Sequence, residues 1–295
     1  MNVREQGFLL LTGYLGDSLE KPLTIPQLRK LTQRMQSSQM PREDRELVPG
    51  DIIRLGYDAE MAERICSLLS NTEQLRRYVQ QGERFDCYPL TRVSQNYPQR
   101  LRDCLAAEAS GVLWAKGNSE ILQRPAIALV GSRDLRDENL TFARQVGIAA
   151  AQQGYVLVSG NARGADRAAQ DSCLEQGGYV ISVVSDRLEK YPLQSHVLYL
   201  SEEGYDLEFS PARALQRNRI IHSLGNKTFV AQCALGKGGT WSGTVKNLQA
   251  SWSPVFCFCD GSAASLELEQ RGAMLVDLPA LHKIEALSSV EQSFL

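Results

Sequence analysis

The sequence predicts an α/β fold in which a parallel sheet is flanked by helices, with a small helical domain in front of it. Three observations lead to this prediction. Short apolar runs alternate with helical stretches from residue 126 onward. Glycines follow several of those stretches, as is common at helix C-termini. Upstream, apolar residues instead recur at helical spacing. We therefore expect a helical N-terminal domain and linker (1–112), an α/β domain (113–277) and a C-terminal tail (278–295).

The expectation for residues 1–112 comes from two amphipathic segments. Ile25, Leu28, Leu31 and Met35 lie three or four positions apart, so they share one helical face. Residues 58–70 repeat this pattern after a polar, turn-rich stretch. The early apolar run "GFLLLTG" is too short for a signal peptide or a membrane span. We expect a cytoplasmic protein without membrane contact.

Strands are expected wherever a short apolar run is bounded by turn residues. Helical segments separate the first three of these runs, and such alternation is typical of parallel sheets with right-handed crossovers. The expected architecture is therefore Rossmann-like. The predicted strands are residues 126–130, 155–160, 179–184, 196–201, 228–233 and 253–258.

Composition narrows the possible ligands. The net charge is −2, so any nucleic-acid binding must come from a local cluster of cations rather than a polybasic surface. Seven cysteines form no C-x-x-C pair and only three histidines are present, which favours buried thiols in a reducing compartment over a metal site. No metal or cofactor is expected.

The loops that follow four predicted strands combine glycines or hydroxyls with cations. Ligands bind at the carboxyl ends of the strands in open parallel sheets, and helix N-termini there offer free N–H groups to anions. We expect a phosphate-bearing ligand at this edge. The residues that would bind it are Gly131, Ser132, Arg133, Ser159, Gly160, Asn161, Arg163, Gly164, Lys237, Gly238, Gly239, Thr240 and Ser242.

Each of these features has an alternative explanation. A single Gly-Ser-Arg sequence can be a tight turn with a solvated arginine. Asp166 can serve only as a helix N-cap. Trp241 is more often a packing residue than a platform for base stacking, and Lys237 can be merely solvated. The phosphate hypothesis rests on the convergence of several loops rather than on any one of them.

The segment 210–227 extends the predicted anion site. Arg213 and Arg217 lie four residues apart on one helical face, and Asn218 and Arg219 complete a polar cluster. An amphipathic helix with a charged outer face would also explain the pattern. However, no acidic residue occurs within the segment, so nothing local neutralises the arginines. We therefore favour a helix that contacts an anion.

Several motifs occur together in one order, and their combination resembles the DNA-processing protein family DprA (Smf). This family is a Rossmann-like group related to the LOG proteins. Residues 97–118 also resemble the linker that follows the family's small N-terminal helical domain. The motifs are "VGSR" at 130–133, "VSGNARGADRAAQ" at 158–170, "YP" at 191–192, "SE" at 201–202, "RNRIIHSL" at 217–224 and a glycine-hydroxyl loop before a helix.

The resemblance implies binding of single-stranded DNA and its transfer to a RecA-type recombinase during transformation of competent cells. It also implies a homodimer. Gln232 stands where the family has a glutamate, the segment between the "YP" and "RNR" motifs is short, and no winged-helix domain is expected, so the sequence indicates a divergent member. The DNA-contacting positions implied by the motifs are Ser132, Arg133, Arg163, Arg217, Asn218, Arg219 and Lys237.

Two other functions remain open. A LOG-like protein would sense a phosphorylated nucleoside, but the glutamate that takes part in ribosyl cleavage in that branch corresponds to Asn247. The sequence also shows no nucleophile elbow. We therefore expect no enzymatic activity, and a catalytically silent nucleotide sensor is the main alternative. A protein-interaction scaffold would suit the acidic C-terminal stretch ending in "SFL" but leaves the anion-friendly loops unexplained.

Overall fold

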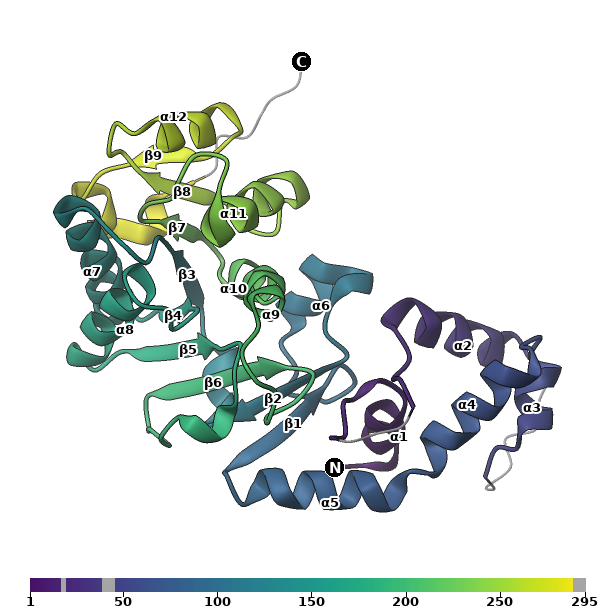
Figure 1. The fold of residues 1–295 in the computed structure, drawn as a ribbon. Helices are drawn as coiled ribbons and strands as arrows, with labels where there is room; N and C mark the ends of the chain where they lie inside the picture. The colour runs from purple at the N-terminus through teal and green to yellow at the C-terminus, as the bar shows by residue number, and fades with distance from the viewer. Residues whose placement is uncertain (17–19, 39–45, 289–295) are drawn as a thin grey trace.

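A computed structural model describes residues 1–16, 20–38 and 46–288 of the chain (Figure 1). Part of the polar stretch that separates the two amphipathic segments therefore lies outside the described residues. The C-terminal "SFL" lies outside them as well. Within the described part, no helix is long and apolar enough to cross a membrane.

The chain begins with helices that pack on one another around a small core of their own. Leu31, Ile52, Ile65 and Leu68 are buried in it. Asn2 and Thr24 each cap a helix by accepting a hydrogen bond from a backbone N–H three residues later. The helices are α1 (Val3–Thr12), α2 (Ile25–Ser37), α3 (Pro49–Arg54), α4 (Ala59–Ser70) and α5 (Thr72–Glu83).

A nine-stranded sheet follows, with the strand order β1-β2-β6-β5-β4-β3-β7-β8-β9. The strands from β3 to β9 pair in parallel, whereas β1 and β2 are antiparallel additions at one edge. The Rossmann-like fold is thus confirmed. The strands are β1 (Cys87–Thr91), β2 (Val112–Lys116), β3 (Ala126–Val130), β4 (Val156–Ser159), β5 (Tyr179–Val183), β6 (Val197–Glu202), β7 (Thr228–Val230), β8 (Val255–Phe258) and β9 (Met274–Val276).

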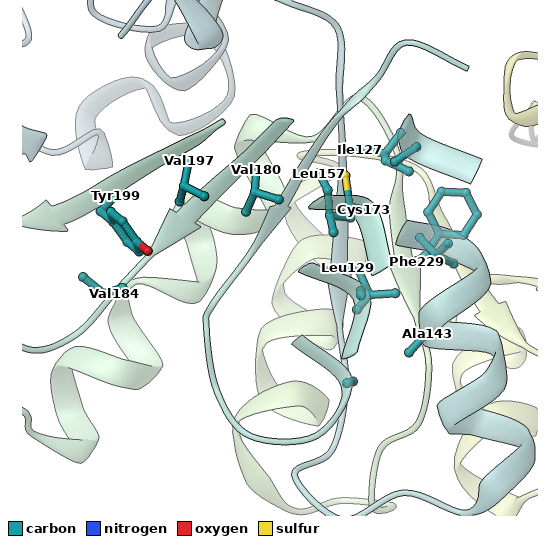
Figure 2. Close-up of a cluster of buried hydrophobic side chains, with 14 of the residues drawn as sticks. Ile127, Leu129, Ala143, Leu157, Cys173, Val180, Val184, Val197, Tyr199 and Phe229 are labelled. Atoms are coloured by element: carbon teal, nitrogen blue, oxygen red, sulfur yellow. The ribbon is translucent and has the colours of Figure 1, made fainter. Parts of the chain in front are cut away.

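Both faces of the sheet are covered because alternate side chains of its buried strands point to opposite sides. Ile127 and Leu129 face α7 and α8 in one core cluster, which Figure 2 shows with Ala143 and Cys173. Ala128 belongs to a second cluster with residues of α6 and α10. The remaining helices are α6 (Gln99–Leu105), α7 (Asp137–Gln152), α8 (Ala165–Glu175), α9 (Pro211–Gln216), α10 (Asn218–Leu224), α11 (Gly238–Ala250) and α12 (Ala263–Gln270), with short 3-10 helices η1 (Ala106–Glu108), η2 (Ser119–Gln123), η3 (Leu188–Lys190) and η4 (Pro279–Ala286).

The sheet starts earlier in the chain than the boundary at residue 112 would suggest. The antiparallel strand β1 lies wholly within residues 1–112, and β2 spans the boundary itself. The expected tail also contributes structure, because Leu281 and Ile284 of η4 are buried against the core cluster that contains Ile127. The parallel strands nevertheless all fall between residues 113 and 277, where their carboxyl ends form the edge considered next.

Candidate functional site

Two connected clefts lie at the carboxyl ends of the central parallel strands. The first, which we name the Asp186 cleft, has a volume of ≈ 300 Å³ and lies between the loops after β4 and β5. The second, the Lys237 cleft, has a volume of ≈ 710 Å³ and lies between the loops after β3 and β7. Both are lined by Arg133, Ala162, Phe209, Ala214 and Arg217, so together they form one strand-end groove.

Most of the residues predicted to bind phosphate line this groove. Those that line it are Gly131, Ser132, Arg133, Gly160, Asn161, Arg163, Arg217, Asn218, Lys237, Gly238, Gly239 and Thr240. Those that do not are Ser159, Gly164, Arg213, Arg219 and Ser242.

Arg217 is the central cation of the groove. It lies between α9 and α10 and is only 8% exposed. Its side chain makes no hydrogen bond to any residue that the structure describes, and its Nε is fully buried without a partner. Burial lowers the pKa of this guanidinium, and the nearby negative charge of Asp166 opposes that effect. Because arginine stays charged in proteins, Arg217 is a buried cation with unused donors.

Asp166 does not cap α8, contrary to one of the alternatives above. The N-cap is Gly164, and Asp166 is in the first turn of the helix. Its buried carboxylate accepts a hydrogen bond from the backbone N–H of Ala162 at 3.2 Å. Burial raises the pKa of this carboxyl, while the charge of Arg217 and backbone N–H groups act in the opposite direction. Asp166 thus shapes the loop after β4 and partly balances Arg217.

The groove loops hold one another in place through short backbone contacts. A Cβ atom on Gly164 would lie 2.4 Å from the carbonyl oxygen of Arg133, so only glycine allows this approach. The hydroxyl of Thr240 donates to the carbonyl of Gly131 at 2.9 Å. The amide of Asn218 donates to the carbonyl of Gly239 at 3.0 Å. Several of the predicted residues therefore build the groove walls with their backbone or polar groups.

Arg133 and Lys237 are exposed cations in the lining of the groove. Neither side chain makes a hydrogen bond or salt bridge with the part of the chain that the structure describes. Lys237 is the N-cap residue of α11, so its backbone directly precedes the free N–H groups of that helix. Arg163 pairs with Asp134 at 2.8 Å, but both side chains are largely exposed and such pairs contribute little. These cations are available to a ligand.

Arg213 and Arg219 have protein partners instead. Arg213 donates to the carbonyls of Ser185 and Glu202 at 2.7 and 3.2 Å, and Arg219 forms a salt bridge with Glu202 at 2.5 Å. No acid of the segment itself neutralises these arginines, as expected, but Arg219 gains a carboxylate partner from outside it, because Glu202 belongs to β6. The segment is also not one helix, since α9 ends and α10 begins around Arg217.

The other predicted residues outside the groove have structural surroundings. Ser159 is fully buried and accepts a hydrogen bond from the side chain of Gln170 at 2.5 Å. Ser242 lines a third cleft, beside α10 and α11. Trp241 packs on the core cluster of α6 and α10, with the Arg271 guanidinium 5.8 Å from its ring centroid. The packing explanation for Trp241 is therefore the better one.

Phe209 is the residue that the sequence analysis missed most clearly. The residue is 51% exposed and lines both clefts of the groove. The only sequence signal was an aromatic residue just before Ser210, which caps α9. Tyr191 also lines the Asp186 cleft, where its ring stacks on Tyr199 with centroids 4.8 Å apart. The groove therefore offers aromatic faces as well as cations.

The position that a LOG-like acid would occupy lies inside the protein. Asn247 is completely buried and accepts a hydrogen bond from the N–H of Ser253 at 2.9 Å. Its amide also lies 3.2 Å from Nδ1 of His222. Burial, helped by the charge of Arg217, lowers the pKa of His222 to about 3, so this imidazole is neutral. Among the described residues, no group of acids, histidines or cysteines is arranged to hold a metal ion.

Comparison with known proteins identifies the family. The family model described as DNA recombination-mediator protein A matches residues 89–278. The chain belongs to this family. It is 32% identical over 163 residues to the DNA processing protein DprA of Streptococcus pneumoniae, which covers 52% of the chain and 54% of that protein. It is 26% identical over 219 residues to the Smf protein of Synechocystis, covering 70% of the chain and 54% of that relative. The chain thus matches about half the length of each of these relatives.

Solved structures of family members share the fold. The X-ray structure of S. pneumoniae DprA aligns with a TM-score of 0.70 and 23% identity, covering 94% of the chain and 95% of that structure. DNA processing protein A of Helicobacter pylori, described for its single-stranded DNA binding mode, aligns with a TM-score of 0.56 and 24% identity over 65% of the chain and 91% of that structure. The predicted membership of the DprA/Smf family is confirmed.

Proposed function

We propose that this chain binds single-stranded DNA in the strand-end groove, through the phosphate backbone and without catalysing a reaction. Membership of the recombination-mediator family supports the proposal, as does the relative described as binding single-stranded DNA. The observation that carries it is Arg217, whose buried side chain lacks a hydrogen-bond acceptor among the described residues.

A phosphate would supply what Arg217 lacks. A buried donor without an acceptor is destabilising by about 1–3 kcal/mol, and more when the group is charged. Guanidinium groups bind phosphate oxygens through paired, charge-assisted hydrogen bonds. Arg133 lines the groove with Arg217 in both clefts, and Lys237 lies in the second cleft beside the N-terminus of α11. These cations form a track that suits successive phosphates of a strand.

Phe209 favours a single strand over a duplex. Bases of a single strand are free to stack on an exposed aromatic ring, and each such contact contributes about 1–3 kcal/mol. In a duplex the same bases are already stacked and paired. Because Phe209 lines both clefts, a base there would lie beside the cations that hold the backbone.

The test is fluorescence anisotropy of a labelled oligothymidylate of about 30 nucleotides, titrated with protein at several salt concentrations. The variant Arg133→Ala/Lys237→Ala should bind at least tenfold more weakly than the parent. The matched control Arg144→Ala/Lys283→Ala removes two exposed cations outside the groove and should bind like the parent. Competition with unlabelled duplex DNA should be weak.

An absence of binding by the parent at about 50 mM salt would exclude the DNA proposal. The next measurement would then be thermal shift with phosphorylated nucleosides, which tests the nucleotide-sensor alternative. The non-enzymatic part is tested separately, by incubating the parent with labelled DNA and with nucleotides. Formation of a cleaved product would contradict it.

We extend the proposal to the finer roles implied by the family. The chain would act in the cytoplasm as a homodimer that hands bound DNA to a RecA-type recombinase during DNA recombination. The family description as a recombination mediator supports this role. Light scattering after size-exclusion chromatography measures the dimer. Faster assembly of recombinase on the strand in the presence of the chain, and not of Arg133→Ala/Lys237→Ala, would support the transfer.

A further inference from the structure

We propose that the Asp186 cleft holds one base of the bound strand and selects guanine, whose ring N–H and amino group would face the Asp186 carboxylate. The inference rests on the proposed binding of DNA in the strand-end groove. It adds a preference for base identity to a surface whose other contacts are to phosphates and to base faces.

The size and position of the cleft suit a single base. Its volume of ≈ 300 Å³ is at the lower end of the range for small-ligand sites, about 300–1,000 Å³. Asn161, Asp186, Tyr191, Phe209 and Arg217 are among its lining residues. Phe209 and Arg217 also line the Lys237 cleft, so a strand held there by its phosphates can turn one base into the Asp186 cleft.

The negative charge of Asp186 requires an explanation in a groove that binds phosphates. A carboxylate and a phosphate repel each other unless the carboxylate has another partner. Three acids line the groove. Asp134 pairs with Arg163, and Asp166 accepts the Ala162 N–H beside Arg217. The carboxylate of Asp186 has more acceptor capacity left than those of Asp134 and Asp166.

One oxygen of Asp186 is fixed and the other retains free acceptor capacity. Oδ1 accepts the hydroxyl of Tyr191 at 2.6 Å, and the ring of Tyr191 is held by stacking on Tyr199. Oδ2 lies 3.8 Å from the half-exposed ammonium of Lys190, which is too long for a hydrogen bond. A carboxylate has about four acceptor sites, so Asp186 can still accept two N–H groups.

A second acceptor in the same cleft also lacks a partner. The side-chain oxygen of Asn161 is buried and accepts no hydrogen bond from the described residues. Asn161 has a positive φ of 59°, a conformation that asparagine tolerates better than most residues. The cleft therefore combines unused acceptors from two strand-end loops with the unused donors of Arg217, and a ligand must donate where it faces Asp186.

Guanine matches this pattern best. Its ring N–H and amino group lie side by side and can both donate to one carboxylate. Cytosine and adenine offer an amino group, and pairing of an acidic side chain with the cytosine amino group is a known base contact. Thymine offers one ring N–H between two carbonyl oxygens, which a carboxylate repels. The expected order of preference is guanine, then cytosine or adenine, then thymine.

The experiment compares three labelled 21-nucleotide strands by anisotropy. One contains only thymine, the second has guanine at every third position, and the third has hypoxanthine there, which keeps the ring N–H but lacks the amino group. We expect the parent to bind the guanine strand about five- to tenfold more tightly than the thymine strand. The hypoxanthine strand should fall between them.

Variants assign the preference to the cleft. Asp186→Asn should reduce the guanine preference to within about twofold, while binding of the thymine strand stays equal or strengthens because a negative charge is removed. Tyr191→Phe keeps the ring but frees Asp186, so the preference should fall without loss of thymine-strand affinity. Glu208→Gln is the control, because Glu208 is exposed, pairs with Lys190 and Arg187, and lies outside the cleft.

The outcomes separate this inference from the proposed function. Equal binding of all three strands by the parent overturns the base preference but leaves DNA binding intact. A preference that persists in Asp186→Asn overturns the assignment to this carboxylate. Binding of no strand removes both proposals. Free deoxyguanosine monophosphate is added as a competitor, and if it binds as tightly as the strand and depends on Asp186, the ligand is a nucleotide and the strand assignment is wrong.

Discussion

Arg217 and Gly160 depend on each other at the level of single atoms. The guanidinium of Arg217 crosses the backbone of Gly160 so closely that a Cβ atom there would lie 1.6 Å from Nη1. Gly160 has no positive φ that would require glycine, so the space for Arg217 is what requires it. A small residue in a strand-end loop thus determines where the central cation of the groove can lie.

Gly160→Ala should therefore weaken binding of single-stranded DNA at least tenfold, because Arg217 must leave its position. The melting temperature should change little, since the group that moves is the end of a flexible side chain. Anisotropy and thermal melting measure the two effects. Gly7→Ala is the control, because an added Cβ would lie more than 4 Å from every described atom beyond its chain neighbours and the nearby backbone of its own helix. A variant that melts early in proportion to its loss of binding would contradict the prediction.

Asp260, which follows β8, contacts the start of α7 and makes the stability of the fold depend on pH. It forms a salt bridge with Arg136 at 2.5 Å and accepts from the amide of Asn139 at 2.8 Å. Burial alone would raise the pKa of this carboxyl, but hydrogen bonds from Ser262, Asn139 and Ser265 outweigh it and lower the pKa to about 2. The ionised form is therefore the one that the folded state prefers.

The lowered pKa determines whether the free energy of unfolding rises or falls with pH. Asp260 stabilises the fold above its ordinary pKa of 3.8, and the stabilisation is lost as the pH falls through about 2. Asp260→Asn should lower the free energy of unfolding by about 1–2 kcal/mol near neutral pH. The difference from the parent should shrink toward about pH 3. Urea unfolding at several pH values measures it, and a difference independent of pH would rule out the linkage.

The sequence predicted which cations line the groove better than it predicted which arginines form salt bridges. Arg133 and Lys237 follow from loops at strand ends, which the alternation of strands and helices brings to one edge. Arg217 follows from the absence of acids in the segment 210–227. The neutralisation of Arg219 by Glu202 could not be predicted, because the two residues are 17 positions apart and belong to different elements. Phe209 was missed because an isolated aromatic residue carries no periodic signal.

At the scale of elements, strands and helices were predicted correctly where the hydrophobic pattern of the sequence is strong, and were missed where that pattern is weak. The six predicted strands all occur, although β7 ends at Val230, three residues earlier than expected. Strand β1 contains Pro89, which suits an edge strand but breaks the sequence signal. Strand β9 has three residues, too few for an alternating pattern. The predicted helix at 210–227 is divided at Arg217, where α9 ends and α10 begins.

Helices α7 and α8 pack closely enough to make one glycine essential for stability. A Cβ atom on Gly147 of α7 would lie 2.1 Å from the carbonyl oxygen of Ala169 in α8. Because the obstacle is backbone, the helices must separate, and α8 carries the loop with Gly160 and Arg163. Gly147→Ala should be destabilising by about 1–3 kcal/mol or more.

The midpoint of urea unfolding measures this effect. Alanine normally stabilises a helix relative to glycine by about 1 kcal/mol, so destabilisation here would report the contact rather than helix propensity. Gly7→Ala in α1, where space is open, should show the usual stabilising direction. A stabilised Gly147→Ala variant would mean that α7 and α8 are farther apart than described.

At the scale of the whole molecule, the net charge of −2 decides how DNA can be held. A slightly acidic protein has no general field that attracts DNA, so attraction must come from where the cations are placed. Acids pair with several of the arginines, among them Arg219, while the structure leaves Arg133, Arg217 and Lys237 without salt bridges in its described part. The sequence could show the balance of charges but not which cations remain unpaired.

The dependence of binding on salt tests this view of the whole molecule. Each phosphate neutralised on a single strand changes the slope of log affinity against log salt by about −0.7, so three or four contacts predict a slope of about −2 to −3. Arg133→Ala/Lys237→Ala should make the slope shallower by about 1.4 if each cation holds one phosphate. Arg144→Ala/Lys283→Ala changes the net charge by the same amount yet should leave the slope unchanged. Equal effects of the two double variants would mean that overall charge, rather than the groove, attracts the strand.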